Sequence, residues 1–241
     1  MEYAEWAPEY GRIRAAFGYP FDREVRSAET LRRLLPPAAR SDPLRRIHER
    51  LHAREVIVVG LAPGAGPPPV WRLPPRAKTP VIVAADGATR ACTGAGLVPA
   101  VIVTDLDGPV PSEISANSRG ALAVIHAHGD NLPTLEEWVP QFPGELAGSW
   151  AGPPTADLID VGGFTDGDRA VHLAEHMGAE RIVLWGFEFD RIDEEDPRLR
   201  EQKIRKLAFA RTALHALAAR SSIPIVLWLR DGSFDRLGAH T

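Results

Sequence analysis

Two aspartates stand two residues apart in the segment Thr104–Gly108, which reads Thr-Asp-Leu-Asp-Gly. The segment follows a short β-branched run, so Asp105 and Asp107 fall at the end of an expected strand and can point to one side. Mg²⁺ prefers hard oxygen ligands and is usually held by one or two carboxylates together with substrate phosphates. Asp86, at another expected strand end, can complete the ligand shell. The spacing therefore favours a Mg²⁺ site of the kind that also holds substrate phosphates.

Further polar clusters follow other expected strand ends. The glycine-rich segment Gly60–Gly66 follows the first strand, and His126–Asn131 (His-Ala-His-Gly-Asp-Asn) follows the fourth. Gly162–Arg169 (Gly-Gly-Phe-Thr-Asp-Gly-Asp-Arg) comes after a later short apolar piece. Ligands of open α/β sheets bind beyond the carboxyl ends of the strands, so clusters on parallel strands converge on one edge. This convergence indicates an active centre.

Each cluster also has a purely structural explanation. Asp166 and Asp168 fall in the first turn of an expected helix with Thr165 as N-cap, where acids are favoured by the helix dipole alone. Asp86-Gly87 is a common turn signal. The segment Gly60–Gly66 lacks the Lys-Ser/Thr ending of a P-loop and does not fit the dinucleotide fingerprint. Its glycines nevertheless let backbone N–H groups approach phosphate closely.

The surplus polar residues leave several roles open. Asp130, Asp166 and Asp168 exceed the needs of one ion and suit a second metal, a hydrogen bond to substrate or a structural role. His126 and His128 have a spacing that suits a metal, but no Cys and few other histidines lie nearby. We therefore expect these histidines to hydrogen bond to a substrate rather than to hold zinc.

The elements that must position these clusters alternate along the chain. Continuous apolar runs predict strands over residues 56–59, 81–84, 101–103, 122–125, 182–185 and 223–229. Helices are expected over residues 89–95, 111–118, 166–177 and 197–219. Runs without polar alternation are typical of strands buried on both faces, and alternating strands and helices form right-handed βαβ units. The expected fold class is α/β, a mostly parallel sheet with helices on both faces.

The chain is expected to divide near residue 53. Residues 1–53 are Arg-rich and carry leucines at helical spacing, which predicts an N-terminal helical segment packed on an α/β catalytic domain over residues 54–241. Two Pro- and Gly-rich stretches, 61–80 and 140–154, are too long for simple connectors. Long loops of this kind are often functional.

Composition excludes several classes of protein. The chain has 241 residues, 44% of them hydrophobic and 25% charged, which suits one globular α/β domain. A net charge of −4 and the lack of a Lys/Arg block make nucleic-acid binding unexpected. The single cysteine, Cys92, excludes an intramolecular disulfide and is expected to be a buried helix residue. We expect a cytoplasmic protein without a membrane partner, because no signal segment and no bilayer-spanning apolar stretch is recognisable.

Taken in order, these clusters resemble the archaeal 6-hydroxymethyl-7,8-dihydropterin pyrophosphokinase family, which is distantly similar to the thiamine pyrophosphokinases. The matching pieces are Ala85–Ala88, Val103–Gly108, His126–Asn131, Gly162–Ala170, Leu184–Phe189, Lys203 and Lys206-Leu207. Phe17-Gly18-Tyr19 also fits, so the resemblance covers nearly the whole chain. The pieces around the histidines and before the expected helix at 166 are long and unusual, which makes the resemblance specific.

The resemblance implies a thiamine-pyrophosphokinase-like catalytic domain that transfers diphosphate from ATP to a reduced hydroxymethylpterin, with AMP as the other product. Such a step belongs to the biosynthesis of methanopterin or folate-type cofactors. Mg²⁺ is then expected on Asp86, Asp105 and Asp107. The expected ATP-binding residues are Gly60, Gly64, Gly66, Asp86, Gly87, Thr165, Asp166, Asp168 and Lys203. The expected catalytic residues are Asp105, Asp107, Asp130 and Arg169, and the expected pterin-binding residues are His126, His128, Asn131 and Phe164.

Three alternatives stay open. The segment Val101–Gly108 is also similar to the aspartyl-phosphate motif of haloacid-dehalogenase-type phosphatases, although Pro109 replaces the usual Thr or Val. A thiamine pyrophosphokinase-like enzyme and a non-catalytic nucleotide-binding module are the others. Clustered carboxylates that hold no ligand repel one another, which disfavours the module.

The acidic run Asp190–Asp196 departs from the basic lid expected for the family. The number of metal ions, the exact acceptor and a possible homodimer are not fixed by these patterns.

Overall fold

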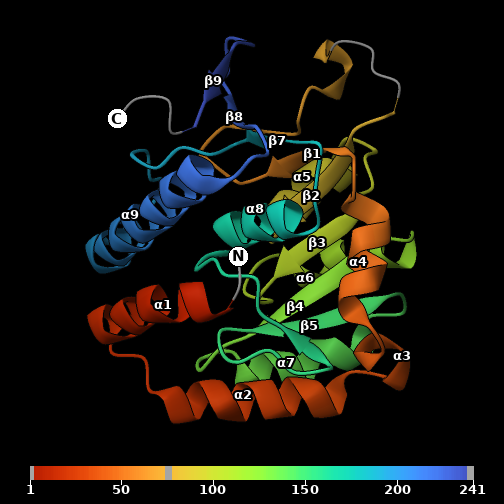
Figure 1. Cartoon of the computed structure of the whole chain (residues 1–241), viewed down its shortest axis with the longest axis vertical. Coiled ribbons are helices and arrows are strands. Elements are labelled where there is room, and N and C mark those ends of the chain that lie inside the picture. Colours follow the sequence, from red (N-terminus) through yellow and green to blue (C-terminus); the bar gives the residue numbers. More distant parts are fainter. Residues whose placement is uncertain (1–2, 74–77, 238–241) are drawn as a thin grey trace.

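The computed structural model describes residues 3–73 and 78–237, which form a nine-stranded sheet covered by helices (Figure 1). The strands are β1 (Glu55–Val59), β2 (Val81–Ala85), β3 (Val101–Thr104), β4 (Leu122–Ala127), β5 (Leu146–Trp150), β6 (Leu158–Ile159), β7 (Arg181–Trp185), β8 (Ile225–Trp228) and β9 (Phe234–Arg236). Their order is β6-β5-β4-β3-β2-β1-β7-β8-β9. Neighbouring strands are parallel except β8 and β9, which are antiparallel. The expected α/β class with a mostly parallel sheet is confirmed.

Helices cover both faces of this sheet. They are α1 (Tyr3–Phe17), α2 (Phe21–Leu34), α3 (Pro37–Arg40), α4 (Pro43–Leu51), α5 (Ala88–Gly94), α6 (Val110–Ser118), α7 (Leu132–Trp138), α8 (Asp166–His176) and α9 (Pro197–Arg220), with 3-10 turns η1 (Val70–Arg72) and η2 (Val139–Gln141). Val101 and Val103 of β3 join an apolar cluster with α4, α8 and α9. Ile102, between them, joins a cluster with α2, α6 and α7 on the other face. Alternate residues of each strand thus serve opposite faces, which explains the continuous apolar runs.

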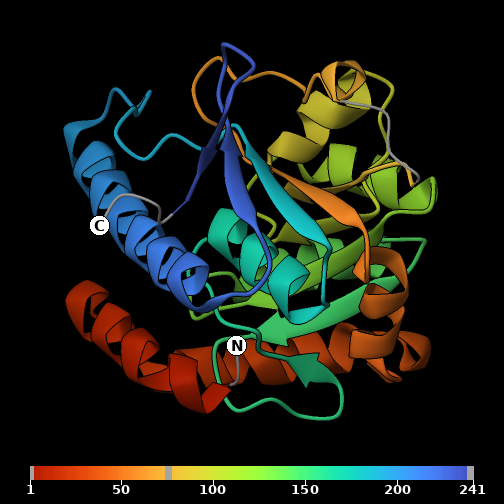
Figure 2. The same cartoon turned by 45° about the horizontal axis from the view of Figure 1, so that its top comes forward.

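The N-terminal helical segment is present and is packed into the same core. Leu31 of α2 is fully buried in the cluster that contains Ile125 of β4. Trp6 and Ile13 of α1 pack with Ala213 of α9, and α1 lies beside α9 in both views (Figures 1 and 2). These helices share apolar clusters with the sheet and with α9. The division into two domains at residue 53 stays a prediction.

The expectation of a long loop over residues 140–154 is wrong. Strand β5 occupies much of this stretch and pairs with β4 on one side and β6 on the other. Helix α7, strand β6 and strand β9 were also not predicted. The other Pro- and Gly-rich stretch, 61–80, contains only the turn η1 in its described residues.

Two simpler expectations can be compared directly with the structure. Cys92 is fully buried in α5, as expected for a small core residue. Across residues 3–73 and 78–237, we find no helix with the length and apolar character needed to cross a membrane.

Candidate active site

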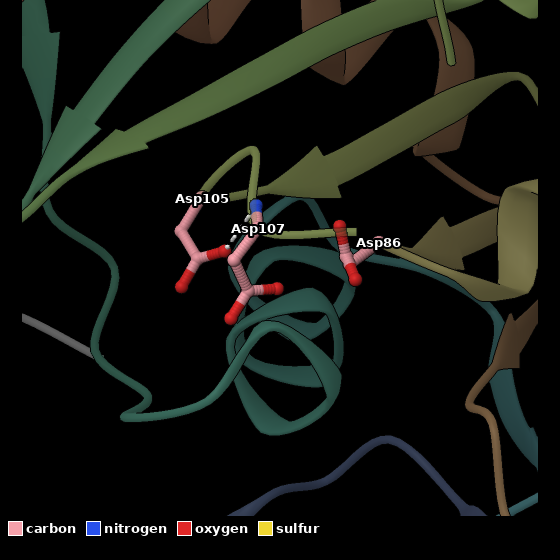
Figure 3. Close-up of side chains that lie close together, drawn as sticks. All are labelled: Asp86, Asp105 and Asp107. Carbon is pink, nitrogen blue, oxygen red and sulfur yellow. Dashed lines mark hydrogen bonds between the residues drawn. The ribbon is translucent and has the colours of Figure 1, made fainter. Parts of the chain in front are cut away.

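Three carboxylates from two neighbouring strand ends form a cluster (Figure 3). Asp86 follows β2, whereas Asp105 and Asp107 follow β3, and one ligand atom of each carboxylate lies within 4.8 Å of the others. β2 and β3 are paired in parallel, so their carboxyl ends bring these residues together. The backbone N–H of Asp107 donates to Asp105 Oδ1 at 3.2 Å. Hard oxygen atoms at this spacing suit a divalent cation, and these three residues are hereafter the carboxylate cluster.

The turn after β3 holds the carboxylate cluster in place. The Thr104 hydroxyl accepts a hydrogen bond from the backbone N–H of Leu106 at 2.9 Å and lies 3.2 Å from Asp86 Oδ1. Leu106 has a left-handed φ of 67° and buries its side chain. A Cβ atom at Gly108 would collide with the Asp86 carboxylate. Glycine at this position therefore permits Asp86 to approach the turn.

Glu113 of α6 supports the carboxylate cluster and was not predicted. Its side chain is fully buried, with Oε1 lying 3.1 Å from the Thr104 hydroxyl. Burial, followed by the charge of Asp86, raises the pKa of Glu113 to about 9. At neutral pH its carboxyl is therefore protonated and hydrogen bonded to Asp86. The helix dipole ordinarily explains an acid in the first turn of a helix. The position of Glu113 in the sequence therefore does not indicate a role in the site.

The ionisation of the carboxylate cluster reflects burial and mutual repulsion. Burial, and then the charges of Asp105 and Asp86, raises the pKa of Asp107 to about 7. Burial would also raise the pKa of Asp105, but hydrogen bonding and charge attraction from His128 outweigh burial and lower it. Burial and then the charge of Asp105 hold the pKa of the nearby Asp166 well above its ordinary value. Such a group of acids favours a bound cation, which would neutralise them together.

The loop after β4 positions one histidine against the carboxylate cluster. His128 Nε2 donates to Asp105 Oδ2 at 3.2 Å, and the backbone nitrogen of Asp130 lies 3.4 Å from His128 Nδ1. The buried Asn131 donates to the backbone carbonyls of Asp105 at 2.9 Å and His126 at 2.8 Å. Its Oδ1 accepts from the His128 N–H at 3.0 Å. The side chain of Asn131 thus positions the backbone of this loop, and its predicted contact with a pterin stays a prediction.

A cavity of about 590 Å³ lies beside the carboxylate cluster and is hereafter the glycine cavity. It is bordered by the loop after β1, the turn after β2, the start of α8, the segment after β7 and one side of α9. The predicted ATP-binding residues all line it: Gly60, Gly64, Gly66, Asp86, Gly87, Thr165, Asp166, Asp168 and Lys203. Its volume falls in the range of about 300–1,000 Å³ that is typical of small-molecule sites. A glycine-rich loop of this kind can bring backbone N–H groups close to phosphate, although those of Gly60, Ala62 and Ala65 donate to backbone carbonyls within the protein.

Several predicted ATP-binding residues make contacts within the protein, among them Asp86, Asp168 and Lys203. Asp168 accepts from the backbone N–H groups of Phe164 at 2.7 Å and Thr165 at 2.6 Å, so it caps α8 as the structural explanation expected. Lys203 donates to Glu194 at 2.9 Å. The acidic run that contains Glu194 therefore supplies an ion-pair partner for a cavity lysine.

A second cavity, of about 210 Å³, is hereafter the histidine cavity. The four predicted catalytic residues and three of the predicted pterin-binding residues line it: Asp105, Asp107, Asp130, Arg169, His126, His128 and Phe164. His126 Nδ1 lies 3.0 Å from the Ser149 hydroxyl, and burial lowers the pKa of His126 well below its ordinary value, so this ring is neutral. The cavity is smaller than the glycine cavity and suits a smaller ligand.

Arg169 contributes a buried positive charge to the histidine cavity. Its exposed fraction is 3%, and Nη2 donates to the Phe164 carbonyl at 3.4 Å. Nε has no hydrogen-bond partner among the residues that the structure describes. A buried guanidinium with unused donors is suited to an anionic ligand.

The N-terminal helices add three residues that sequence reasoning missed. Tyr10 of α1, Tyr19 after it and Glu24 of α2 line the histidine cavity. Tyr10 and Glu24 are buried, and the resemblance over Phe17-Gly18-Tyr19 was the only sequence signal near them. A segment that looked like a helical cap thus supplies one wall of the candidate site.

The glycine cavity and the histidine cavity share a boundary. Thr165, Asp166, Lys203 and Lys206 line both. Asp86 lines the first cavity, whereas Asp105 and Asp107 line the second. Two ligands bound side by side would meet at the carboxylate cluster, which is the arrangement needed for group transfer between them.

A family model and curated proteins are similar to this chain. The family model described as "6-hydroxymethylpterin diphosphokinase MptE-like" matches residues 38–194, a range that contains the whole carboxylate cluster. The curated 6-hydroxymethyl-7,8-dihydropterin pyrophosphokinase of Methanocaldococcus jannaschii is 33% identical over 240 residues, which cover 92% of this chain and 98% of that protein. The protein of the same name from Pyrococcus furiosus is 40% identical over 238 residues, with coverage of 94% and 98%. The Methanothermobacter thermautotrophicus protein of that name is 37% identical over 198 residues, with coverage of 80% and 81%. This chain therefore belongs to the MptE-like family of 6-hydroxymethylpterin diphosphokinases.

Proposed function

We propose that this protein transfers diphosphate from ATP to the hydroxymethyl group of 6-hydroxymethyl-7,8-dihydropterin, which gives AMP and the pterin diphosphate. The observation that carries the proposal is the meeting of two cavities of different size at the carboxylate cluster. The acceptor follows from the names of the three curated relatives. In this assignment ATP occupies the glycine cavity and the pterin occupies the histidine cavity.

The carboxylate cluster is proposed to hold Mg²⁺. Its oxygen atoms fit a hard cation, and no cysteine takes part. The bound ion would neutralise charge on the ATP phosphates, which is the usual contribution of Mg²⁺ to phosphoryl transfer. Glu113 and Thr104 hold Asp86 at the cluster, and His128 holds Asp105.

The reaction requires positioning and charge neutralisation more than covalent chemistry. The acceptor oxygen forms a bond to the β-phosphorus of ATP, and the bond from that phosphorus to the oxygen bridging toward the α-phosphorus breaks, which releases AMP. Arg169, Lys203 and Lys206 line the histidine cavity, and they are proposed to offset the negative charge that develops. Asp130 is proposed to orient the hydroxyl and to accept its proton, because it lines the same cavity as Asp105.

An AMP-release assay with ATP, Mg²⁺ and alternative acceptors tests the proposal. We expect one AMP per pterin diphosphate with 6-hydroxymethyl-7,8-dihydropterin and none with thiamine. Formation of ADP would contradict transfer of a diphosphate. AMP formed with thiamine alone would indicate a thiamine pyrophosphokinase, and ATP binding without any AMP would indicate a non-catalytic module.

Two further features of the enzyme stay predictions. A homodimer is one possible assembly, and light scattering after size-exclusion chromatography measures it. A cytoplasmic location is the other, and a fluorescent fusion in an archaeal host tests it.

A further inference from the structure

The N-terminal helices bring a buried carboxylate to the histidine cavity. Glu24 lies in the first turn of α2 and lines the cavity, yet it is only 2% exposed. Acids are almost never buried this completely unless they are paired. Taking a carboxylate out of water costs free energy unless its oxygen atoms accept hydrogen bonds. Both carboxylate oxygen atoms of Glu24 therefore need hydrogen-bond donors.

The protein supplies only part of these donors. Glu24 is hydrogen bonded to the Tyr10 side chain and to the backbone of Gly129. Its Oε2 atom is buried without a hydrogen-bond partner among the described residues. An unmet buried acceptor destabilises the free protein, and a ligand that carries N–H donors recovers that loss.

The other acids of the histidine cavity are committed elsewhere. Asp105 and Asp107 belong to the carboxylate cluster, and their charges contribute to the raised pKa of Asp166. Asp130 has 60% of its side chain exposed and forms an ion pair with an arginine of α2. Glu24 is therefore the buried acid of this cavity that is left to recognise a neutral ring.

A 2-amino-4-oxopteridine carries donors that match a carboxylate. Its ring N3–H and its 2-amino group present two parallel N–H bonds, in the fork by which a guanidinium binds a carboxylate. The aminopyrimidine of thiamine instead has a ring nitrogen acceptor beside its amino group. One carboxylate oxygen would then face a lone pair, which is repulsive. A carboxylate at this place distinguishes the two rings.

The rest of the cavity suits a flat ring. The rings of His126 and His128 are nearly parallel, with an interplanar angle of 27° and centroids 6.2 Å apart. Phe164 packs on Phe17 with ring centroids 5.3 Å apart. Aromatic walls favour a planar ligand but do not select its polar edge, so that selection falls to Glu24.

We propose that Glu24 is a specificity-determining residue whose carboxylate accepts the N3–H and the 2-amino N–H of the acceptor ring. This assignment rests on the proposed function, because it presumes that a pterin occupies the histidine cavity. It gives the N-terminal helices a direct part in substrate choice.

Binding of two ring probes without ATP tests the assignment. The probes are 6-hydroxymethylpterin and 6-hydroxymethyllumazine. In the lumazine a carbonyl replaces the 2-amino group and ring N1 carries a hydrogen, while N3–H is present in both. We expect the unaltered enzyme to prefer the pterin by about tenfold or more, the factor that corresponds to one good hydrogen bond. In Glu24→Gln the amide keeps one acceptor and gains a donor that fits the lumazine carbonyl. The preference should therefore vanish or reverse, while the affinity for ATP stays unchanged.

Glu29→Gln is the matched control, because Glu29 is an exposed acid on the same helix. It should keep the full preference for the pterin. Glu24→Asp keeps the charge with a side chain one methylene shorter, so it should retain the sign of the preference with weaker binding. This second variant decides the matter if Glu24→Gln does not fold, and unweakened pterin binding in it would overturn the assignment.

The outcomes separate this assignment from the proposed function. If the unaltered enzyme releases AMP with the pterin and Glu24→Gln still prefers pterin to lumazine, the role of Glu24 is wrong and the function stands. If the unaltered enzyme neither binds the pterin nor releases AMP with it, the proposed function fails and the assignment fails with it.

Discussion

At the scale of residues, the carboxylate cluster should matter for turnover and not for folding. Asp105→Asn or Asp107→Asn removes one oxygen ligand, and we expect Mg²⁺-dependent turnover to fall by about 3 kcal/mol or more in activation free energy. The melting temperature of the metal-free protein should not fall in Asp107→Asn, because that change relieves the repulsion that Asp105 and Asp86 exert on Asp107. Steady-state kinetics and thermal melts measure the two effects.

Asp190→Asn provides the control for these variants. Its side chain is 87% exposed and pairs with Arg211, and Asp190 does not line the glycine cavity or the histidine cavity. It should leave turnover unchanged. Unchanged turnover in both Asp105→Asn and Asp107→Asn would remove the metal assignment.

Cation binding should depend on pH through Asp107. Its pKa in the folded, metal-free protein is about 7, against an ordinary value of 3.8, so below pH 7 a cation must displace a proton. Affinity for Mg²⁺ should fall by roughly tenfold for each pH unit below 7. The metal-free protein should lose stability as pH rises from 4 to 7, because over that range its folded state binds the extra proton. Thermal melts with and without Mg²⁺ at pH 6, 7 and 8 measure the linkage, and a Mg²⁺-induced shift that is independent of pH would contradict it.

The residues of the candidate site were predictable to different degrees. Asp105, His128 and Arg169 stand directly after strands or at the start of a helix, so the parallel topology alone predicts that they converge. Glu24 and Glu113 lie within helices whose first turns ordinarily carry acids. Tertiary packing brings these two residues to the site, and the residues next to them in the sequence do not predict that packing.

At the scale of elements, the turn after β3 depends on the absence of a side chain at Gly108. A Cβ atom there would meet the carboxylate of Asp86, which is the movable end of a flexible side chain. Gly108→Ala should therefore displace Asp86 and weaken Mg²⁺ binding by tenfold or more, at a cost in stability of only about 1 kcal/mol. Isothermal titration with Mg²⁺ and a thermal melt test this expectation.

Gly11→Ala in α1 is the control for that change. A Cβ at Gly11 has no atom within 4 Å, and alanine is the better helix former by about 1 kcal/mol. It should leave Mg²⁺ binding unchanged and raise stability slightly. Equal Mg²⁺ affinity in the two variants would show that Gly108 is not what admits Asp86.

Most strands were predictable because they are continuous β-branched runs buried on both faces, whereas β5 was not. Its sequence contains Gly148, a residue type that is depleted in strands, and it has no β-branched residue. The glycine is imposed by packing, since a Cβ at Gly148 would lie 2.7 Å from Leu35 Cδ1. Strand β6, with two residues, is too short to leave a periodic pattern.

At the scale of the whole molecule, the N-terminal helices should unfold together with the sheet. Leu31 is fully buried in the apolar cluster that includes β4, so Leu31→Ala should cost about 2–5 kcal/mol. We expect a single transition in denaturant by both circular dichroism and tryptophan fluorescence. Leu199→Ala, at a position that is 50% exposed on α9, should change stability by less than about 0.5 kcal/mol. Two separate transitions would instead support a domain boundary near residue 53.

The boundary that the glycine cavity shares with the histidine cavity has a thermodynamic consequence. Asp166, Lys203 and Lys206 line both, so a charged ligand on one side alters the potential felt on the other. ATP and the pterin should then bind cooperatively. By linkage, the factor by which ATP tightens the pterin must equal the factor by which the pterin tightens ATP. When AMP leaves the glycine cavity, the nucleotide no longer increases affinity in the histidine cavity. The affinity for the pterin product would then fall at the stage of the cycle at which the product must dissociate.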